Sequence, residues 1–297
     1  DRIRQALEVA AEAARVDGNE AVAVRCADAI DQLDGAAIGT LHAFAHSVAA
    51  VATERDVVEA AGPDAASFLQ GKLSQEIEKL AVGASASTLL LQPQGKVDAW
   101  FRLTRVGDEA FRADIEAGHG EALLARLQRF LLRTKAVLTL STEPMVAIRG
   151  TATAPGSVVP ALDPAWPGVE GVDLLGTAQV PDGLETASTD VLERLRIEAG
   201  VPAMGTELTD RTIPAEAGVV ERSVSFTKGC FTGQELVARI DSRGGNVPRH
   251  LRRLEAEGPD ALPVGGDVVV AGQVVGEVTS SVPAGNGRPA VALAYVG

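Results

Sequence analysis

The sequence predicts an α+β protein, and three observations support this fold class. Between residues 56 and 199, runs with strand-like alternation and runs with helical spacing follow one another irregularly. After residue 253, short apolar runs are separated by glycine-rich turns, a pattern typical of an all-β unit. Alanine-rich stretches with helical spacing come before both regions. We therefore expect a helical extension (1–54), a central α+β domain (55–253) and a small C-terminal β-barrel or sandwich (254–297).

The apolar spacing also predicts the individual elements. Helices are expected over 2–16, 21–33, 63–80, 119–133 and 190–199. Strands are expected over 56–60, 88–92, 97–106, 109–115, 136–140, 145–148, 267–270, 273–279 and 289–295. The proline- and glycine-rich stretch 155–171 is expected to be a long surface connection.

Length and composition restrict the class of protein. The chain has 297 residues, 46% of them hydrophobic, so it can bury a substantial core. It contains no apolar run of about 18 residues and no signal-peptide pattern at its start, so we expect a soluble, cytoplasmic protein without membrane contact. Cys26 and Cys230 are expected to be free thiols. His42 and His46 are four residues apart but have no evident third ligand, so no metal site is expected.

The charge is strongly negative overall but uneven along the chain. A net charge of −13 opposes direct nucleic-acid binding and binding to anionic membranes. Residues 228–253, however, contain six basic side chains against two acidic ones. That local excess favours a small anionic ligand.

The sharpest local motif is Lys228-Gly229-Cys230-Phe231-Thr232-Gly233-Gln234-Glu235. Thr232 and Glu235 have capping-box spacing, which predicts a helix that begins near Gly233. Cys230 then precedes a helix N-terminus, which together with Lys228 favours the thiolate and a reactive role. A buried cysteine in a tight turn explains the motif equally well, and the residues alone do not decide between the two.

The same motif resembles the signature of YgfZ-type proteins, which are relatives of the glycine cleavage T-protein. Three further blocks match in family order, so the resemblance covers about residues 55–297: Phe68-Leu69-Gln70-Gly71-Lys72-Leu73, Leu91-x-Pro93-Gln94-Gly95-Lys96-Val97 and Arg194-Leu195-Arg196-Ile197-Glu198-Ala199-Gly200-Val201-Pro202.

The resemblance implies a ring-like α+β domain with a folate in a central channel and a C-terminal β-barrel beside it. It implies tetrahydrofolate or a one-carbon derivative as the cofactor, and iron–sulfur enzymes as client partners. The implied function is that of an accessory protein in the maintenance of iron–sulfur proteins or in tRNA modification. Glu198 matches the glutamate that holds the pterin, whose adjacent N–H donors suit a carboxylate.

Carried over in the same way, Lys228 and Arg239 belong to the basic run that receives the glutamate tail, and Cys230 handles a labile group or a partner thiol. The alternative for Glu198 is a solvated residue in the last turn of a helix.

One departure from the family pattern bears on catalysis. Aminomethyltransferases carry two consecutive aspartates where this chain has Asp98-Ala99. Asp98 is either a remaining catalytic group or a polar residue on the exposed face of a strand. We therefore expect no conventional aminomethyltransferase, and the alternative function is an aminomethyltransferase- or demethylase-like enzyme that produces methylenetetrahydrofolate.

A second resemblance is confined to the first 48 residues. The segment Thr40-Leu41-His42-Ala43-Phe44 is similar to the Thr-x-His-x-Phe segment of UvrD-like helicases. The chain has no phosphate-binding loop of the form Gly-x-x-x-x-Gly-Lys-Ser/Thr, so it cannot be a working motor. We expect the extension to be dispensable for the fold of the remainder.

Overall fold

The computed structural model describes residues 49–154, 156, 157, 159–285 and 287–297. The expected helices at 2–16 and 21–33, the helicase-like segment, Cys26, His42 and His46 lie outside these residues. The following elements are found in chain order: β1 (Ala49–Ala61), α3 (Ala65–Lys72), β2 (Ser85–Leu91), β3 (Val97–Gly107), β4 (Ala110–Glu116), α4 (Gly120–Gln128), β5 (Val137–Arg149), β6 (Ala161–Leu162), β7 (Gly171–Leu175), β8 (Glu185–Thr186), α5 (Thr189–Glu198), α6 (Val220–Ser223), α7 (Gln234–Ser242), β9 (His250–Ala256), β10 (Asp267–Val270), β11 (Gln273–Val282) and β12 (Ala290–Val296).

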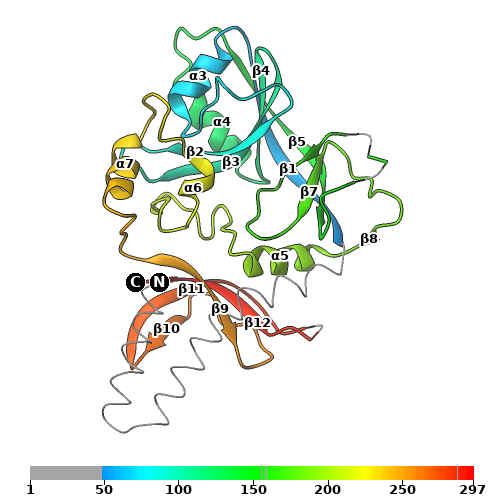
Figure 1. The fold of residues 1–297 in the computed structure, drawn as a ribbon, viewed down its shortest axis with the longest axis vertical. Helices are drawn as coiled ribbons and strands as arrows, with labels where there is room; N and C mark the ends of the chain where they lie inside the picture. Colours follow the sequence, from blue (N-terminus) through cyan, green and yellow to red (C-terminus); the bar gives the residue numbers. More distant parts are fainter. Residues whose placement is uncertain (1–48, 155, 158, 286) are drawn as a thin grey trace. The chain divides into compact units, whose positions relative to one another are not determined.

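The larger sheet is built around β1 (Figure 1). Its strand order is β2-β3-β4-β1-β5-β7-β6, with antiparallel pairing throughout this path, and the short strand β8 adds a parallel pairing to β1. Strands and helices are thus mixed irregularly along the chain, which confirms the α+β prediction in its coarse form.

The C-terminal residues form a second, four-stranded antiparallel sheet with the order β10-β11-β12-β9. Three of its strands were expected from the sequence, and β9 was not. Closure of this sheet into a barrel stays a prediction. Helix α5 lies against this sheet, because Ile197 packs with Val291 and Leu293 of β12.

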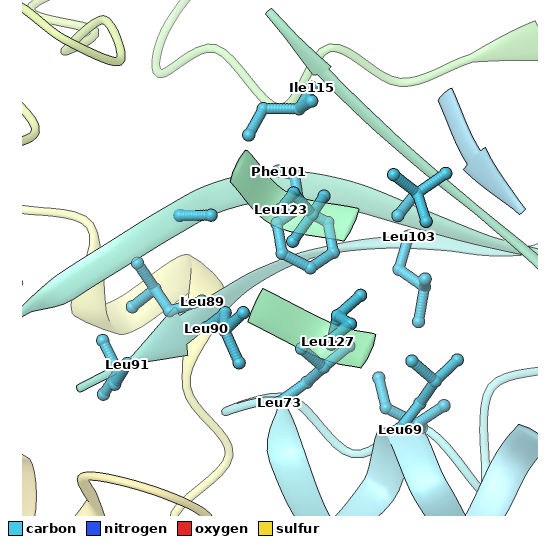
Figure 2. Packing of buried hydrophobic residues seen from close by; sticks show 14 of the residues in the cluster. Leu69, Leu73, Leu89, Leu90, Leu91, Phe101, Leu103, Ile115, Leu123 and Leu127 are labelled. Atoms are coloured by element: carbon cyan, nitrogen blue, oxygen red, sulfur yellow. The ribbon is translucent and has the colours of Figure 1, made fainter. Parts of the chain in front are cut away.

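The main core lies on one face of the large sheet, where α3 and α4 cover β2, β3 and β4 (Figure 2). Strand β3 shows why its residues form a strand of this kind. Val97, Ala99, Phe101 and Leu103 alternate along it and are all at most 3% exposed, so the even-numbered side chains point to the opposite face. The core buries leucines from both helices, from β2 and from the residue that follows α3: Leu69, Leu73, Leu89, Leu90, Leu91, Leu123 and Leu127.

Several element boundaries differ from the sequence prediction for identifiable reasons. Strand β1 begins at Ala49 rather than at Asp56, because residues 49–54 pair with residues 144–149 of β5. The two strands expected around Pro144 are one strand, β5, and the proline sits within it opposite Glu54. The helix expected to reach Leu80 ends at Lys72, since Leu73 leaves it to form a bridge with Leu90 of β2.

The helix expected over 119–133 also ends early, at Gln128. The proline- and glycine-rich connection contains the two-residue strand β6. Within the described residues, no helix combines the length and the apolar composition needed to cross a bilayer.

Candidate functional site

A cavity of about 440 Å³ lies on the face of the large sheet opposite the main core, with α5 along its other side. Its walls come from strands that are distant in sequence, from α5 and from the connection before β7. The residues that line it include Arg55, Trp100, Arg102, Glu116, Met145, Arg149, Trp166, Asp173, Asp190, Leu192, Glu193 and Arg196.

The alternation of the strands explains why polar side chains reach this cavity. On β3, Phe101 and Leu103 enter the core, so Arg102 faces the other way, and Trp100 lines the cavity while also packing against the main core. On β4, Ala113 and Ile115 are core residues, and Glu116 reaches the cavity. The chain has two tryptophans, Trp100 and Trp166, and both line this cavity.

A buried ion network crosses the floor of the cavity. The Arg102 guanidinium donates two hydrogen bonds to the Asp114 carboxylate, at 2.8 and 2.9 Å, and one to Asp173, at 2.8 Å. Arg55 also pairs with Asp114, at 3.2 Å. Although burial alone would lower the pKa of Arg102, the charges of Asp114 and Asp173 raise it. Loss of one partner from such a network leaves a buried charge uncompensated and costs about 3–5 kcal/mol.

Arginine side chains also bind the connection before β7, which forms one wall of the cavity. Arg149 pairs with Asp173 at 2.8 Å and stacks over the Trp166 ring, 4.2 Å from its centroid. Arg102 donates to the backbone carbonyl of Asp163, and Arg222 donates to that of Ala165. The position of Trp166 therefore depends on the same cations that organise the floor.

The uncompensated charge of the cavity is negative. Each lining arginine is already paired: Arg55, Arg102 and Arg149 with the aspartates above, and Arg196 with Glu193 and Glu207. Glu54, Glu116 and Asp190 also line the cavity, and none of them forms an ion pair with another described residue. These carboxylates can therefore accept hydrogen bonds from a ligand, and the buried Nε of Arg149, which has no hydrogen-bond partner among the described residues, is an available donor.

Glu116 is the most clearly oriented of these three carboxylates. Its two oxygens each lie 3.3 Å from the backbone nitrogen of Met204, which donates to them. Burial raises the pKa of Glu116, while the positive charge of Arg55 opposes this effect. A carboxylate in this setting is stabilised most by a ligand that donates N–H groups to it, because the hydrogen bonds are then charge-assisted.

Glu198, the residue predicted to hold the pterin, does not line the cavity. Its carboxylate pairs with Arg194 at 3.3 Å and with Arg288 at 2.8 Å. It lies two residues after Arg196 on α5, and two residues correspond to about 200° around a helix, so the two side chains point in nearly opposite directions. Glu198 thus connects α5 to the turn between β11 and β12.

Lys228 likewise forms its hydrogen bonds within the protein. Its ammonium donates to the backbone carbonyls of Gln70, Leu73 and Gln75, at 2.6, 2.6 and 2.8 Å, where it caps the end of α3. Burial lowers the pKa of Lys228 to about 8. Arg239 is half exposed on α7 and pairs with Glu235. Neither cation is among the cavity residues.

Asp98 lies apart from the cavity as well. Its carboxylate accepts a 2.6 Å hydrogen bond from Arg126 of α4. The pairing of β2 with β3 shifts register between Leu90 and Leu91, next to Asp98.

Cys230 is exposed in the loop before α7. Its neighbour Phe231 is buried in the main core, so the loop is fixed while the thiol remains at the surface.

The helix expected to begin near Gly233 is present, but its N-cap is Gly233 and no side chain caps it. The predicted capping box of Thr232 and Glu235 is therefore not formed. The buried-cysteine interpretation is wrong for Cys230.

The structure therefore brings none of the five predicted site residues into the cavity, and their functional roles stay predictions. The cavity residues themselves were not predicted from the sequence motifs. The available signal was the placement of polar and aromatic side chains at the even positions of an otherwise apolar strand, as in Trp100 and Arg102. Which strands share that face depends on the strand order, and periodicity does not give the order.

No family model matches the chain. It is 30% identical over 277 residues to an aminomethyltransferase of Streptomyces avermitilis, an alignment that covers 79% of this chain and 74% of that protein. It is 31% identical over 216 residues to a mitochondrial iron–sulfur cluster assembly factor IBA57 homolog of Mycosarcoma maydis, covering 64% of this chain and 53% of that one. It is 25% identical over 218 residues to the tRNA-modifying protein YgfZ of Edwardsiella ictaluri, covering 64% and 65%.

The fold has a solved counterpart. The glycine cleavage system aminomethyltransferase T of Bartonella henselae superposes with a TM-score of 0.70 at 19% identity, covering 86% of this chain and 80% of that one. At that identity the match bears on the fold alone. Taken with the extent of the alignment to the Streptomyces protein, it confirms the resemblance carried by the four sequence blocks: this chain belongs to the family of T-protein-like and YgfZ-type proteins.

Proposed function

We propose that the chain is a tetrahydrofolate-binding accessory protein in the maintenance of iron–sulfur proteins or in tRNA modification. The relatives named as an iron–sulfur cluster assembly factor and as a tRNA-modifying protein support this function. The structural observation that carries the folate part is the cavity of about 440 Å³, whose walls contain both tryptophans and three carboxylates that form no ion pair with another described residue.

The residues of the cavity fit the pterin part of a folate. A reduced pterin is flat and presents several N–H donors, so it suits aromatic walls and carboxylate acceptors. Glu116 would accept from the ring N–H groups, and Trp100 and Trp166 would pack on apolar surface. Because every arginine of the cavity is already paired, the anionic glutamate tail is expected to lie outside it. A bound tetrahydrofolate would carry the one-carbon unit.

The identity of the pterin anchor separates this proposal from the sequence prediction. Glu116 lines the cavity and Glu198 does not. Loss of a charge-assisted hydrogen bond costs about 1.5–3 kcal/mol. Glu116→Gln should therefore weaken tetrahydrofolate binding by roughly 10- to 150-fold, while Glu198→Gln changes it by less than about twofold.

Quenching of tryptophan fluorescence measures this binding directly, because both tryptophans are at the site. Tetrahydrofolate should quench saturably under reducing conditions, and p-aminobenzoylglutamate, which lacks the pterin, should not. Single Trp100→Phe and Trp166→Phe variants assign the signal. Saturable binding that is abolished by Glu198→Gln and unaffected by Glu116→Gln would restore the sequence prediction and overturn this site.

The accessory role needs a separate measurement in cells that lack the protein. Activity of an iron–sulfur enzyme should be restored by the unaltered chain and less well by Glu116→Gln at equal protein level.

The alternative function, that of an aminomethyltransferase, is supported by the Streptomyces relative. It predicts formation of methylenetetrahydrofolate from an aminomethyl donor, which should be lost in Asp98→Ala.

A further inference from the structure

A second hollow lies between the segment 213–226 and α7, and we call it the α6–α7 groove. Its volume is about 510 Å³, and it shares no lining residue with the cavity described above. Its walls are formed mainly by apolar side chains: Ile213, Pro214, Ala215, Val220, Val224, Phe226, Val237 and Ile240.

The groove has a closed apolar floor and an exposed aromatic rim. Val224 and Val237 are buried and connect the floor to the main core. Phe226, in contrast, is 46% exposed, and it is the only phenylalanine among the large apolar side chains that the described residues leave exposed. An exposed aromatic ring beside an apolar hollow is typical of a surface that binds another protein segment.

The charge of the groove is negative. Glu221 and Asp241 belong to its lining, and both are exposed. Neither carboxylate forms an ion pair with another described residue, and Arg239, the cation within α7, pairs with Glu235. These two charges disfavour a nucleic acid and complement lysine or arginine.

The groove adjoins the loop that presents the exposed thiol. Phe226 and Cys230 belong to the same connection between α6 and α7. That connection is held by the three hydrogen bonds of Lys228 and by the buried ring of Phe231. A segment bound in the groove would therefore lie beside a fixed loop whose thiol faces solvent.

We propose that the α6–α7 groove binds a segment of a partner protein in which a bulky apolar side chain is flanked by lysine or arginine. The apolar side chain packs against Phe226 and Val237, and the cations pair with Glu221 and Asp241. The proposal does not depend on folate, since the two hollows share no residue.

The test uses the full chain and two fluorescein-labelled peptides, Gly-Lys-Leu-Phe-Lys-Gly and Gly-Glu-Leu-Phe-Glu-Gly, in fluorescence anisotropy titrations. The lysine peptide should bind and the glutamate peptide should not. The double variant Glu221→Lys/Asp241→Lys should weaken binding of the lysine peptide at least tenfold, and Phe226→Ser should weaken it at least fivefold. Both variants change exposed side chains, and their folding is checked by the denaturant midpoint of unfolding, which should be unchanged.

A matched control accounts for the attraction of any basic peptide to a negatively charged chain. Glu257→Lys/Asp260→Lys changes the net charge by the same amount at exposed positions outside the groove, and it should alter binding less than twofold. If the control weakens binding as much as the groove variant does, the attraction is general and the groove is excluded. Equal binding of both peptides, or no binding of the lysine peptide, would also overturn the proposal.

Discussion

The backbones of Gly95 and Gly233 lie in direct contact. A Cβ atom placed on Gly233 would lie 3.1 Å from the Cα of Gly95 and 2.5 Å from the carbonyl oxygen of Gln92. The two glycines belong to separate sequence blocks of the family, one before β3 and one before α7. Their contact explains why both blocks need glycine at these positions, since each residue also has a positive φ.

Replacing Gly233 by alanine should destabilise the protein. The backbone has φ +79°, which costs a residue with a Cβ about 1–2 kcal/mol, and the contact with Gln92 adds about 1–3 kcal/mol of overpacking. Gly244 is the matched control, because it has the same φ but nothing within 4 Å of an added Cβ. Denaturant unfolding should show a larger loss for Gly233→Ala than for Gly244→Ala. Equal losses would mean that the contact between the two loops contributes nothing.

Asp56 is expected to make stability depend on pH in the acid range. Its carboxylate accepts hydrogen bonds from the backbone of Gly118 and Gly120 and from Thr142, at 2.8–2.9 Å. Burial alone would raise the pKa of Asp56, but these hydrogen bonds, that of Gly120 foremost, lower it below its ordinary value. A lowered pKa in the folded state means that the stabilisation is present above about pH 4 and is lost as the pH falls through the folded pKa.

Asp56→Asn should therefore lower the free energy of unfolding at pH 7 by about 1–3 kcal/mol, and the difference from the unaltered chain should shrink below about pH 4. Unfolding measured from pH 7 to pH 3 checks this, with the exposed Asp260→Asn as the control. A difference that stays constant over this range would show that the charge of Asp56 is not involved.

Cys230 should react with iodoacetamide in the native protein. The thiol is exposed, and the loop around it is held by Lys228 and Phe231. Mass spectrometry of the digested protein should place the adduct on Cys230. Cys230→Ser should change the free energy of unfolding by less than about 0.5 kcal/mol, as for other exposed positions. A native protein that leaves Cys230 unmodified, or a serine variant that unfolds easily, would contradict the surface placement.

The domain boundary that the sequence suggested near Arg55 can be tested by truncation. A chain that begins at Ala49 keeps the whole of β1, whereas one that begins at Arg55 loses the residues paired with 144–149 of β5. The lost segment includes the buried Ala50 and Val51. We expect the shorter chain to be less stable by at least about 3 kcal/mol, from lost apolar burial and ladder hydrogen bonds. Equal denaturant midpoints for the two chains would support the boundary near Arg55 that the sequence suggested.

The sequence predicted β3 well because its residues alternate cleanly. Val97, Ala99, Phe101 and Leu103 read as one buried face, and the strand has the expected start. The length of β1 was predicted too short from the sequence, because Thr53 and Glu54 interrupt its apolar pattern. Only the pairing with β5 shows that these residues continue the strand. Local periodicity therefore located the elements, and tertiary pairing set their ends.

The site was harder to predict than the fold. The four sequence blocks identified the family, but the residues drawn from them largely support the structure: Lys228 caps α3, Glu198 pairs with Arg194 and Arg288, and Asp98 pairs with Arg126. A charged residue in a motif does not reveal whether its partner is a ligand or the protein backbone. That distinction requires the strand order and the side-chain directions.

The position of β1 has a consequence for synthesis of the chain. This strand pairs with β4 and β5, so it can acquire each partner only after that strand has been made. Its last residue leaves the ribosome roughly 90 residues before the end of β5, which corresponds to about 4–18 s of elongation. The edge of this 13-residue strand that pairs with β4 is open until Glu116 has been made, and the edge that pairs with β5 is open to other chains for the whole interval. Aggregation of nascent chains should therefore fall when elongation between residues 62 and 149 is fast and rise when it is slowed, whereas slowing beyond residue 250 should matter little.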